Sequence, residues 1–439
     1  MVHSVGTRQC GRGQRPDRSN RMASGQGEVA PRFVDGARTA GPLSDVMTPA
    51  PPTSTRAPEI RALTGARGIP VLLIVLFHFH EWHGYSGVPW YDTVASKGYI
   101  WVEFFFALSG LHPLLCLWGR FGAGLRVGAI GAFLAARVSR LYPLQVVTLL
   151  AVAILEADRR IAESRQLGVG FFDIPIFEGR TPGTFLSNLF MVQAWGLYDI
   201  LSWNAPAWFV SVEYFLCLVC PMLMLLVRAR FGWRALALGG GSIAFLVALV
   251  EASGAGLDLT ARHGMWRGLA DFGIGLALGS LFLASRNKDG GGRPLPTSAH
   301  TLAQIGVLVA VAAALGLSGP ARTPRDLMVA APIFALIFVL AFDKGLIARA
   351  LHAPGLMKLG EWSFAIYMVH YIVMCVLPAL GLQESPWLAC LAGIGGSIAV
   401  GALAWRFVER PLAEALRRKL LNVSGQSRAP KTPPKTHRR

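Results

Sequence analysis

The stretch RALTGARGIPVLLIVLFHFHEWHG, residues 61–84, decides the class of fold. No charged residue lies between Arg67 and His78, so this segment has no polar face to present to water. In a helix, about 20 apolar residues at 1.5 Å rise cross the ~30 Å hydrocarbon core of a bilayer. An open sheet is excluded there, because its backbone groups find no partners in lipid. The stretch therefore predicts a transmembrane helix.

Comparable apolar blocks recur along the whole chain. Only 15% of the 439 residues are charged and 53% are hydrophobic, whereas soluble domains carry about 25% charged residues. This balance excludes an ordinary cytosolic enzyme, a disordered protein and a fibrous repeat. We predict an all-α, polytopic integral membrane protein with about ten transmembrane helices, at residues 66–83, 98–117, 137–156, 207–228, 234–252, 264–285, 302–318, 326–343, 362–381 and 387–406.

The distribution of positive charge indicates the orientation. If the N-terminus is cytoplasmic, the inner segments hold 33 Lys and Arg residues and the outer connectors hold 8. The positive-inside rule then favours both termini in the cytoplasm. We expect residues 1–57 to form a disordered basic cytoplasmic tail, 58–412 the membrane domain and 413–439 a second basic cytoplasmic tail.

A net charge of +17 would suggest nucleic acid as the partner of a soluble protein. Here the basic residues lie outside the apolar blocks, so we expect membrane lipids as partners and no nucleic acid.

The longest outer connector, residues 157–206, contains the apolar run TFLSNLFMVQAW at 184–195. This run is too short to cross a bilayer. We predict an interfacial or re-entrant helix there instead of an eleventh span, with a plain loop helix as the alternative.

Ionisable residues at membrane depth are costly, so each is a candidate functional residue. His78 and Glu103 each lie about five residues below the outer end of their spans, the first and the second. Spans joined by a short connection are usually neighbours, which predicts that these two side chains pair. A carboxylate beside an imidazole raises its basicity and favours a general base. A structural ion pair between the two helices is the alternative.

Arginines gather at the inner ends of the first and third spans. Arg137 and Arg140 share a helix face because of their i, i+3 spacing, and Arg67 lies at the same boundary. Three guanidiniums in this position fit the phosphates of a cytosolic ligand. The alternative is that they anchor the helices at the lipid headgroups.

Later spans carry further polar residues. Ser211 and Glu213 are expected near the outer end of the fourth span, at the depth of His78. Glu409 and Arg410, in the run FVERP, are expected to form a structural salt bridge or a helix stop before the proline. Three more polar groups are expected to face inward: Arg267, Tyr367 and His370.

Six motifs follow one another along the chain: Arg67-x10-His78, Glu103 with FFFALSGL, Arg137-x-x-Arg140 with Tyr142 and Pro143, WFVSVEYFLCLVCP, GEWSFAIYMVH and the closing ERP. Taken in this order, they resemble membrane-bound acyltransferase family 3, the O-acyltransferases of bacterial surface polysaccharides and related metabolites. The resemblance covers nearly all of residues 58–412. The chain departs from the family pattern at Glu103, where Asp is commoner, and at Tyr214, where a second acid is frequent.

The resemblance implies a membrane O-acyltransferase of the bacterial inner membrane. It implies an acyl-coenzyme A donor, usually acetyl-coenzyme A, on the cytoplasmic side, and as acceptor a hydroxyl of a carbohydrate or lipid-linked saccharide. No metal is implied. His78 is then the general base, and Glu103 orients it. The other site residues that the resemblance implies are Arg67, Arg137, Arg140 and Tyr142 for the donor, and Ser109, Ser211, Glu213 and His370 for the acceptor.

Two other functions remain open at this point. Acylation of a small secondary metabolite fits the same family. A proton-coupled transporter also has many spans with buried His, Glu and Arg residues. A carrier, however, does not need three arginines below one histidine, and no clear inverted repeat is visible in the sequence.

Overall fold

The structure is a computed structural model, and it describes residues 59–84, 86–121, 127–165, 179–227, 232–288, 295–382 and 385–423. The chain divides into two units, Met1–Thr53 and Ser54–Arg439, and all the described residues belong to the second unit. The predicted tail 1–57 therefore lies outside the described residues, as does the stretch 424–439 of the second tail.

Within the described residues, ten helices are long and apolar enough to cross a membrane, and no strand is present there. This confirms the predicted fold class and the predicted spans. The long helices are α1 with α2 (Arg61–Ala66 and Gly68–His83), α4 (Val102–Phe121), α5 (Val127–Ser164), α7 (Trp208–Val227), α8 (Trp233–Ser253), α9 (Gly264–Lys288), α10 (Thr297–Leu317), α11 (Leu327–Ala341), α13 (Pro354–Val376) and α14 (Pro386–Ala404).

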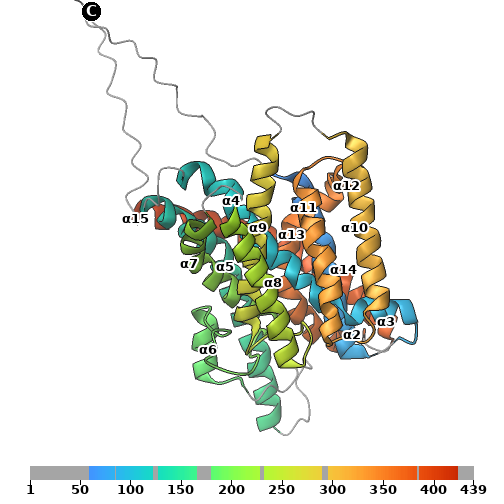
Figure 1. The fold of residues 1–439 in the computed structure, drawn as a ribbon. Coiled ribbons are helices and arrows are strands. Elements are labelled where there is room, and N and C mark those ends of the chain that lie inside the picture. The colour runs from blue at the N-terminus through green and yellow to red at the C-terminus, as the bar shows by residue number, and fades with distance from the viewer. Residues whose placement is uncertain are drawn as a thin grey trace, which may run out of the picture. The chain divides into compact units, whose positions relative to one another are not determined.

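Shorter helices lie at the two ends of the bundle. Helices α12 (Leu346–Leu351) and α15 (Arg410–Val423) lie at one end, and α3 (Pro89–Ser96) and α6 (Pro182–Leu189) lie at the other (Figure 1). The remaining turns are the 3₁₀ helices η1 (Gly98–Trp101), η2 (Ala205–Ala207), η3 (Pro324–Asp326) and η4 (Pro378–Leu380), and the π-helical turn η5 (Trp405–Glu409).

Helix α6 is the short helix predicted in the long connector, and the described part of that connector contains no eleventh span. It begins earlier than the apolar run suggested, because Thr181 caps it. The Thr181 hydroxyl accepts the Thr184 N–H, the Thr184 hydroxyl accepts the Thr181 N–H, and Pro182 occupies the first turn. The helix ends before Met191, whose φ of 57° is left-handed.

Helix α5 is 38 residues long, much longer than the predicted span 137–156. Its additional turns carry charged side chains at i, i+3 and i, i+4 spacing, which stabilise a helix outside the apolar core. Glu156 lies 2.7 Å from both Arg159 and Arg160. Arg180, from the segment before α6, approaches the same carboxylate at 2.9 Å. Local charge pairing thus extends the helix beyond its apolar stretch.

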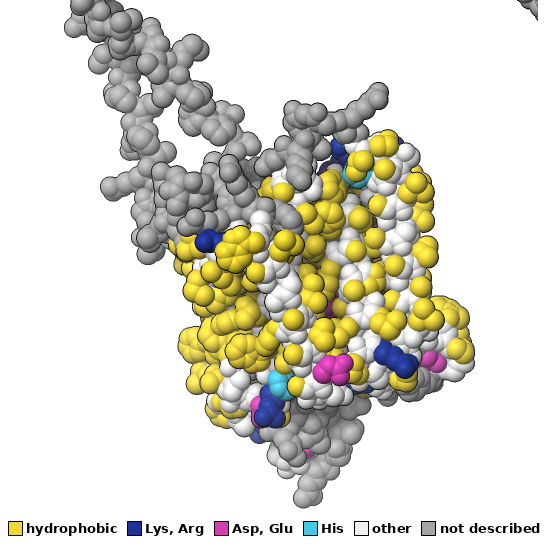
Figure 2. All heavy atoms as spheres, viewed as in Figure 1, with side chains coloured by type: hydrophobic (Ala, Val, Ile, Leu, Met, Phe, Trp, Pro, Cys, Tyr) yellow, Lys and Arg dark blue, Asp and Glu magenta, His cyan; other side chains and the backbone are white. Residues whose placement is uncertain are grey.

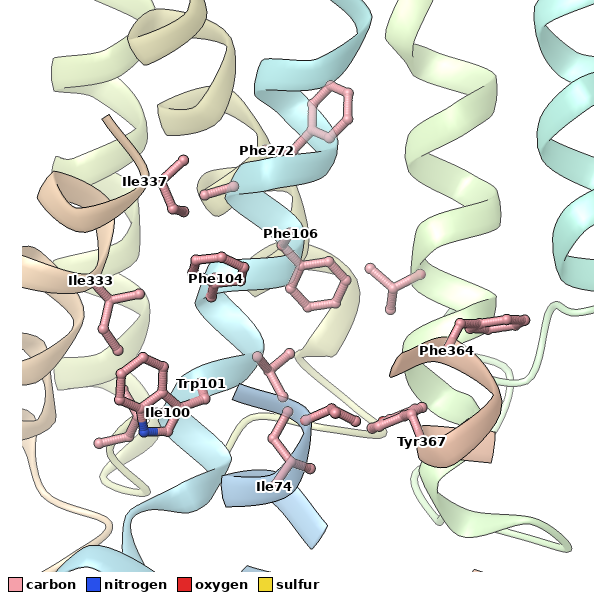
Figure 3. Packing of buried hydrophobic residues seen from close by; sticks show 14 of the residues in the cluster. Ile74, Ile100, Trp101, Phe104, Phe106, Phe272, Ile333, Ile337, Phe364 and Tyr367 are labelled. Atoms are coloured by element: carbon pink, nitrogen blue, oxygen red, sulfur yellow. The ribbon is translucent and has the colours of Figure 1, made fainter. Parts of the chain in front are cut away.

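The centre of the bundle depends on a close contact between α4 and α9. A Cβ atom on Gly110 would lie 2.1 Å from the carbonyl oxygen of Phe272, and one on Gly275 would lie 2.0 Å from that of Ala107. Small residues allow membrane helices to bring their backbones together in this way. Figure 3 shows the aromatic side chains of α4 packed between side chains of α11 and α13.

The periphery of the bundle is apolar. Only 17% of the apolar stretch of α10 is buried inside the protein. For Gly98–Leu115, which includes most of the central helix α4, the buried share is 72%. On the face in Figure 2, hydrophobic side chains cover the middle of the bundle, and charged side chains lie mainly toward its two ends. This distribution is the one that a lipid environment selects.

The predicted helix stop before Pro411 is wrong. The π-helical turn η5 precedes the proline, and the chain continues as α15 to Val423. A π turn widens the helix by one residue, which accommodates the missing proline N–H. Glu409 also does not pair with Arg410 as expected. Its carboxylate lies 4.0 Å from Arg140, whereas Arg410 pairs with Glu414.

Candidate active site

A cavity of about 360 Å³ opens between α2, α7, α9 and α13, at the end of the bundle that carries α3 and α6. We call this end the cavity end. Four of the lining side chains are acids, an imidazole or a guanidinium: His78, Glu81, Asp258 and Arg267. Most of the remaining wall is apolar or aromatic, and its aromatic residues are Phe77, Trp82, Tyr99, Trp208, Tyr367 and Tyr371.

His78 is oriented by its own helix. Its Nδ1 lies 2.9 Å from the carbonyl oxygen of Ile74, one turn earlier in α2. A carbonyl oxygen can only accept a hydrogen bond, so Nδ1 carries a proton, and in the neutral imidazole Nε2 then keeps its lone pair. The imidazole lines the cavity in this tautomer. It is therefore prepared to accept a proton from a hydroxyl bound there.

His370 of α13, predicted to bind the acceptor, lies beside His78 but is not among the side chains that line the cavity. The two ring centroids are 4.8 Å apart. His370 Nδ1 lies 2.5 Å from the carbonyl oxygen of Tyr367, so the same reasoning leaves a lone pair on its Nε2. That atom is buried and has no hydrogen-bond partner among the described residues. Tyr367 in turn donates its hydroxyl to the carbonyl oxygen of Pro206 at 2.7 Å, which ties α13 to η2 at the cavity wall.

The predicted pairing of Glu103 with His78 is wrong. Glu103 instead accepts two hydrogen bonds from Arg267 of α9, at 2.8 Å from Nε and 2.6 Å from Nη2. Neither side chain is exposed at all. A buried carboxylate requires a compensating full charge, and a guanidinium that binds both oxygens supplies it better than a neutral imidazole. Arg267 also lines the cavity, so Glu103 acts there by holding Arg267.

Arg267 was not predicted as a site residue. The signal was present in the sequence, because Arg267 is the one Lys or Arg that lies well inside a predicted span, where a charge is costly. Arg267 also donates to the backbone carbonyl oxygens of Tyr99 at 2.9 Å and Leu259 at 3.4 Å, and its guanidinium lies 5.8 Å from the centroid of the Trp208 ring. These contacts hold a cation beside the cavity that contains His78.

The three predicted donor-binding arginines do come together, at the end of the bundle that carries α12 and α15. We call this end the basic end. Arg67 lies within electrostatic range of both Arg137 and Arg140. Two carboxylates are interspersed: Glu213 lies 3.7 Å from Arg137, and Glu409 lies 4.0 Å from Arg140. Three guanidiniums against two carboxylates leave an excess of positive charge, which suits a polyanionic ligand.

The other predicted acceptor residues, Ser109, Ser211 and Glu213, do not line the cavity either. Glu213 belongs to the basic end, where it accepts a hydrogen bond from Ser109 Oγ at 2.9 Å. Ser211 is buried, and its hydroxyl accepts the Ala194 N–H at 3.0 Å. The sequence placed Ser211 and Glu213 at the depth of His78, and this prediction was wrong. The turn η2 lies at the level of the cavity, so both residues lie one to two turns further along the chain, in α7. Tyr142, predicted to bind the donor, packs against the apolar core.

An ion-pair bridge stands at the mouth of the cavity. Arg322 lies 2.6 Å from Glu81 and 2.8 Å from Asp258, which both line the cavity. The hydrogen bonds that Arg322 donates, first to Glu81 and then to Asp258, raise the pKa of its guanidinium above the ordinary value. Arg322 therefore keeps its positive charge at any physiological pH.

The fold and the site define an all-helical, multi-pass membrane protein with a histidine-lined cavity toward one end of its bundle and an arginine cluster toward the other. The chain belongs to acyltransferase family 3: the family model, an acyltransferase domain, matches residues 60–406. The protein is therefore an acyltransferase.

Two curated relatives agree with this assignment. The chain is similar to the acyltransferase MdmB of Streptomyces mycarofaciens, with 25% identity over 399 residues that cover 84% of this chain and 95% of the relative. A shorter match, 35% identical over 85 residues, covers 19% of this chain and 22% of nodulation protein 10 of Rhizobium leguminosarum bv. viciae. No solved structure matches the chain.

Proposed function

We propose that this membrane O-acyltransferase moves an acyl group, acetyl in the first instance, from acyl-coenzyme A to a hydroxyl of a carbohydrate acceptor. The donor enters at the basic end, which faces the cytoplasm of a bacterial inner membrane, and the acceptor binds in the cavity at the other end. One observation carries the proposal. Three clustered arginines and an open cavity lie at opposite ends of the bundle, and His78 faces the cavity.

The distance between the two ends fits a coenzyme A donor. Arg67 and His78 are eleven residues apart on the α1–α2 segment, which corresponds to a rise of about 16 Å along a helix. A pantetheine arm is long enough to cover this rise. With its phosphates at Arg67, Arg137 and Arg140, the donor presents its thioester at the level of His78.

The chemistry then requires one base and no covalent enzyme intermediate. The acceptor hydroxyl attacks the thioester carbonyl carbon while His78 Nε2 removes its proton. The carbon–sulfur bond breaks, and the departing thiolate receives a proton from the imidazolium. Arg267, held by Glu103, places positive charge beside the cavity where the carbonyl oxygen becomes negative.

The lining of the cavity supports a saccharide acceptor. Flat aromatic side chains bury the apolar faces of a sugar ring, and a small number of polar groups orient its hydroxyls. Trp82, Trp208 and Tyr367 provide such faces around His78. A sugar of a surface polysaccharide or of a lipid-linked saccharide fits this description. A small glycosylated metabolite is the second candidate, because the wall is more apolar than polar.

Membrane vesicles of defined orientation test the proposal. Inverted vesicles expose the cytoplasmic face, so acetyl-labelled coenzyme A should label a saccharide acceptor in inverted vesicles and not in right-side-out vesicles. Membranes without the protein are the control. A lipid-linked saccharide fraction and a panel of small glycosides, supplied separately, distinguish the two acceptor classes. Absence of labelled ester from both fractions, or equal labelling from both faces, would overturn the proposal.

A further inference from the structure

The arginine cluster of the basic end contains two buried carboxylates that the proposed reaction does not use. The side chains of Glu213 and Glu409 are only 7% and 8% exposed. Each lies near one arginine of the cluster and within electrostatic range of Arg67 as well. In each of them Oε2 forms no hydrogen bond with any residue that the structure describes.

These two carboxylates hold the arginines loosely. A charge-assisted N–H···O hydrogen bond measures about 2.7–2.9 Å, and the Glu103–Arg267 pair has contacts of 2.6 and 2.8 Å. The separation from Arg137 to Glu213 is 3.7 Å, and that from Arg140 to Glu409 is 4.0 Å. The two acids therefore place negative charge beside the arginines without the close bidentate geometry that locks Arg267 in place.

Two separate elements bring the acids to this position. Glu213 comes from α7, and Glu409 ends the π-helical turn η5. Such turns interrupt regular helices and are frequent at functional sites. Burial of two carboxylates is costly unless nearby positive charge compensates them, as the arginines of the cluster do here. Two elements that both supply an acid to one basic cluster indicate a function for the acids in ligand binding.

The chemistry of the reaction supplies that function. Acyl-coenzyme A and the coenzyme A that leaves after transfer carry the same phosphates. Arginines that bind these phosphates tightly therefore hold the product as strongly as the donor, and such uniform binding lowers KM without raising kcat. Negative charge beside the arginines opposes the phosphates of both molecules equally.

We propose that Glu213 and Glu409 are built-in counter-ions of the donor site, which weaken phosphate binding and so allow spent coenzyme A to leave. The inference rests on the proposed function, in which these arginines bind the phosphates of acyl-coenzyme A. Both residues act on the ligand through the charge of the cluster and not through contact with the reacting atoms.

The test measures donor KM and the inhibition constant of coenzyme A in inverted vesicles, for Glu409→Gln and Glu213→Gln at matched protein levels. Removal of one nearby like charge should lower both constants by about 3- to 10-fold. The matched control is Glu414→Gln, the same charge change on α15, where the side chain is 62% exposed and pairs with Arg410; it should change neither constant. S-acetylpantetheine, which has no phosphate, should be used with an unchanged KM by every variant.

Tighter donor and product binding in the two variants, absent in the control and absent with S-acetylpantetheine, supports the inference. A raised or unchanged donor KM in both variants overturns it, because the acids then serve only to hold the arginines in place. An equal decrease in Glu414→Gln also overturns it. Each variant is a separate test, so if one variant fails to accumulate, the other still decides the result.

If the wild-type protein uses no acyl-coenzyme A, the proposed function itself fails. If it does and the variants do not bind it more tightly, only this inference fails.

Discussion

Removal of the Glu103 charge should damage the protein far more than removal of a comparable charge at its surface. Glu103→Gln leaves the guanidinium of Arg267 buried without the one carboxylate that hydrogen-bonds to it among the described residues. Both side chains are fully buried, and both hydrogen bonds between them are short. Breaking a buried pair by changing one partner costs about 3–5 kcal/mol, a large part of the ~5–15 kcal/mol that stabilises a typical folded domain.

The matched control is Glu81→Gln. Glu81 also pairs with an arginine, Arg322, at 2.6 Å, but their side chains are 39% and 41% exposed. Exposed pairs contribute about 0–1 kcal/mol, so this variant should unfold at nearly the wild-type temperature. The assay is thermal unfolding of the purified proteins in one detergent, together with initial rates of acyl transfer.

A double variant separates stability from catalysis. Glu103→Gln with Arg267→Gln removes both charges together, so much of the lost stability should return. Acyl transfer should not return, because the cavity has lost its cation. A wild-type melting temperature for Glu103→Gln, with only a change in the pH dependence of the rate, would refute the reasoning and favour a direct partnership of Glu103 with His78.

Three further predictions concern the base, the donor site and the orientation. His78→Ala should lower acyl transfer by about 10²–10⁴-fold at unchanged abundance, and near wild-type turnover would remove His78 from this role. Arg140→Lys keeps the charge and loses the bidentate fork, so donor KM should rise moderately; Arg137→Ala with Arg140→Ala should raise it much more, and excess donor should restore part of the rate. If the arginines are only membrane anchors, the double variant will change abundance and leave donor KM unaltered. A reporter active only outside the cytoplasm should be silent when fused after residue 421 and active when inserted near residue 175; the reverse pattern contradicts the predicted orientation.

The sequence alone was sufficient for the fold class, the ten spans and the gathering of three arginines at one end. Each of these depends on a local property. Apolar length determines whether a segment crosses a bilayer, and i, i+3 spacing places Arg137 and Arg140 on one face of whatever helix contains them. The tautomer of His78 is similarly local, because its Nδ1 bonds the carbonyl oxygen of Ile74 in the same helix.

The partners of the buried charges could not be predicted in the same way. Glu103 was assigned to His78 because their spans are consecutive, yet the structure joins it to Arg267, 164 residues further along the chain. Glycines at the contact of α4 with α9 let these two helices approach closely, and this approach brings the guanidinium within reach of the carboxylate.

The depth of Ser211 and Glu213 was also decided by tertiary structure. The sequence places them near the start of a span, but it does not show that the 3₁₀ turn η2 fills the cavity wall above them. Hydropathy shows which segments are apolar and long enough to cross a bilayer. It does not show which helices pack against one another. The spans and their charged ends can therefore be predicted from the sequence. The partners of buried side chains depend on which helix faces pack together, and only the tertiary structure decides that.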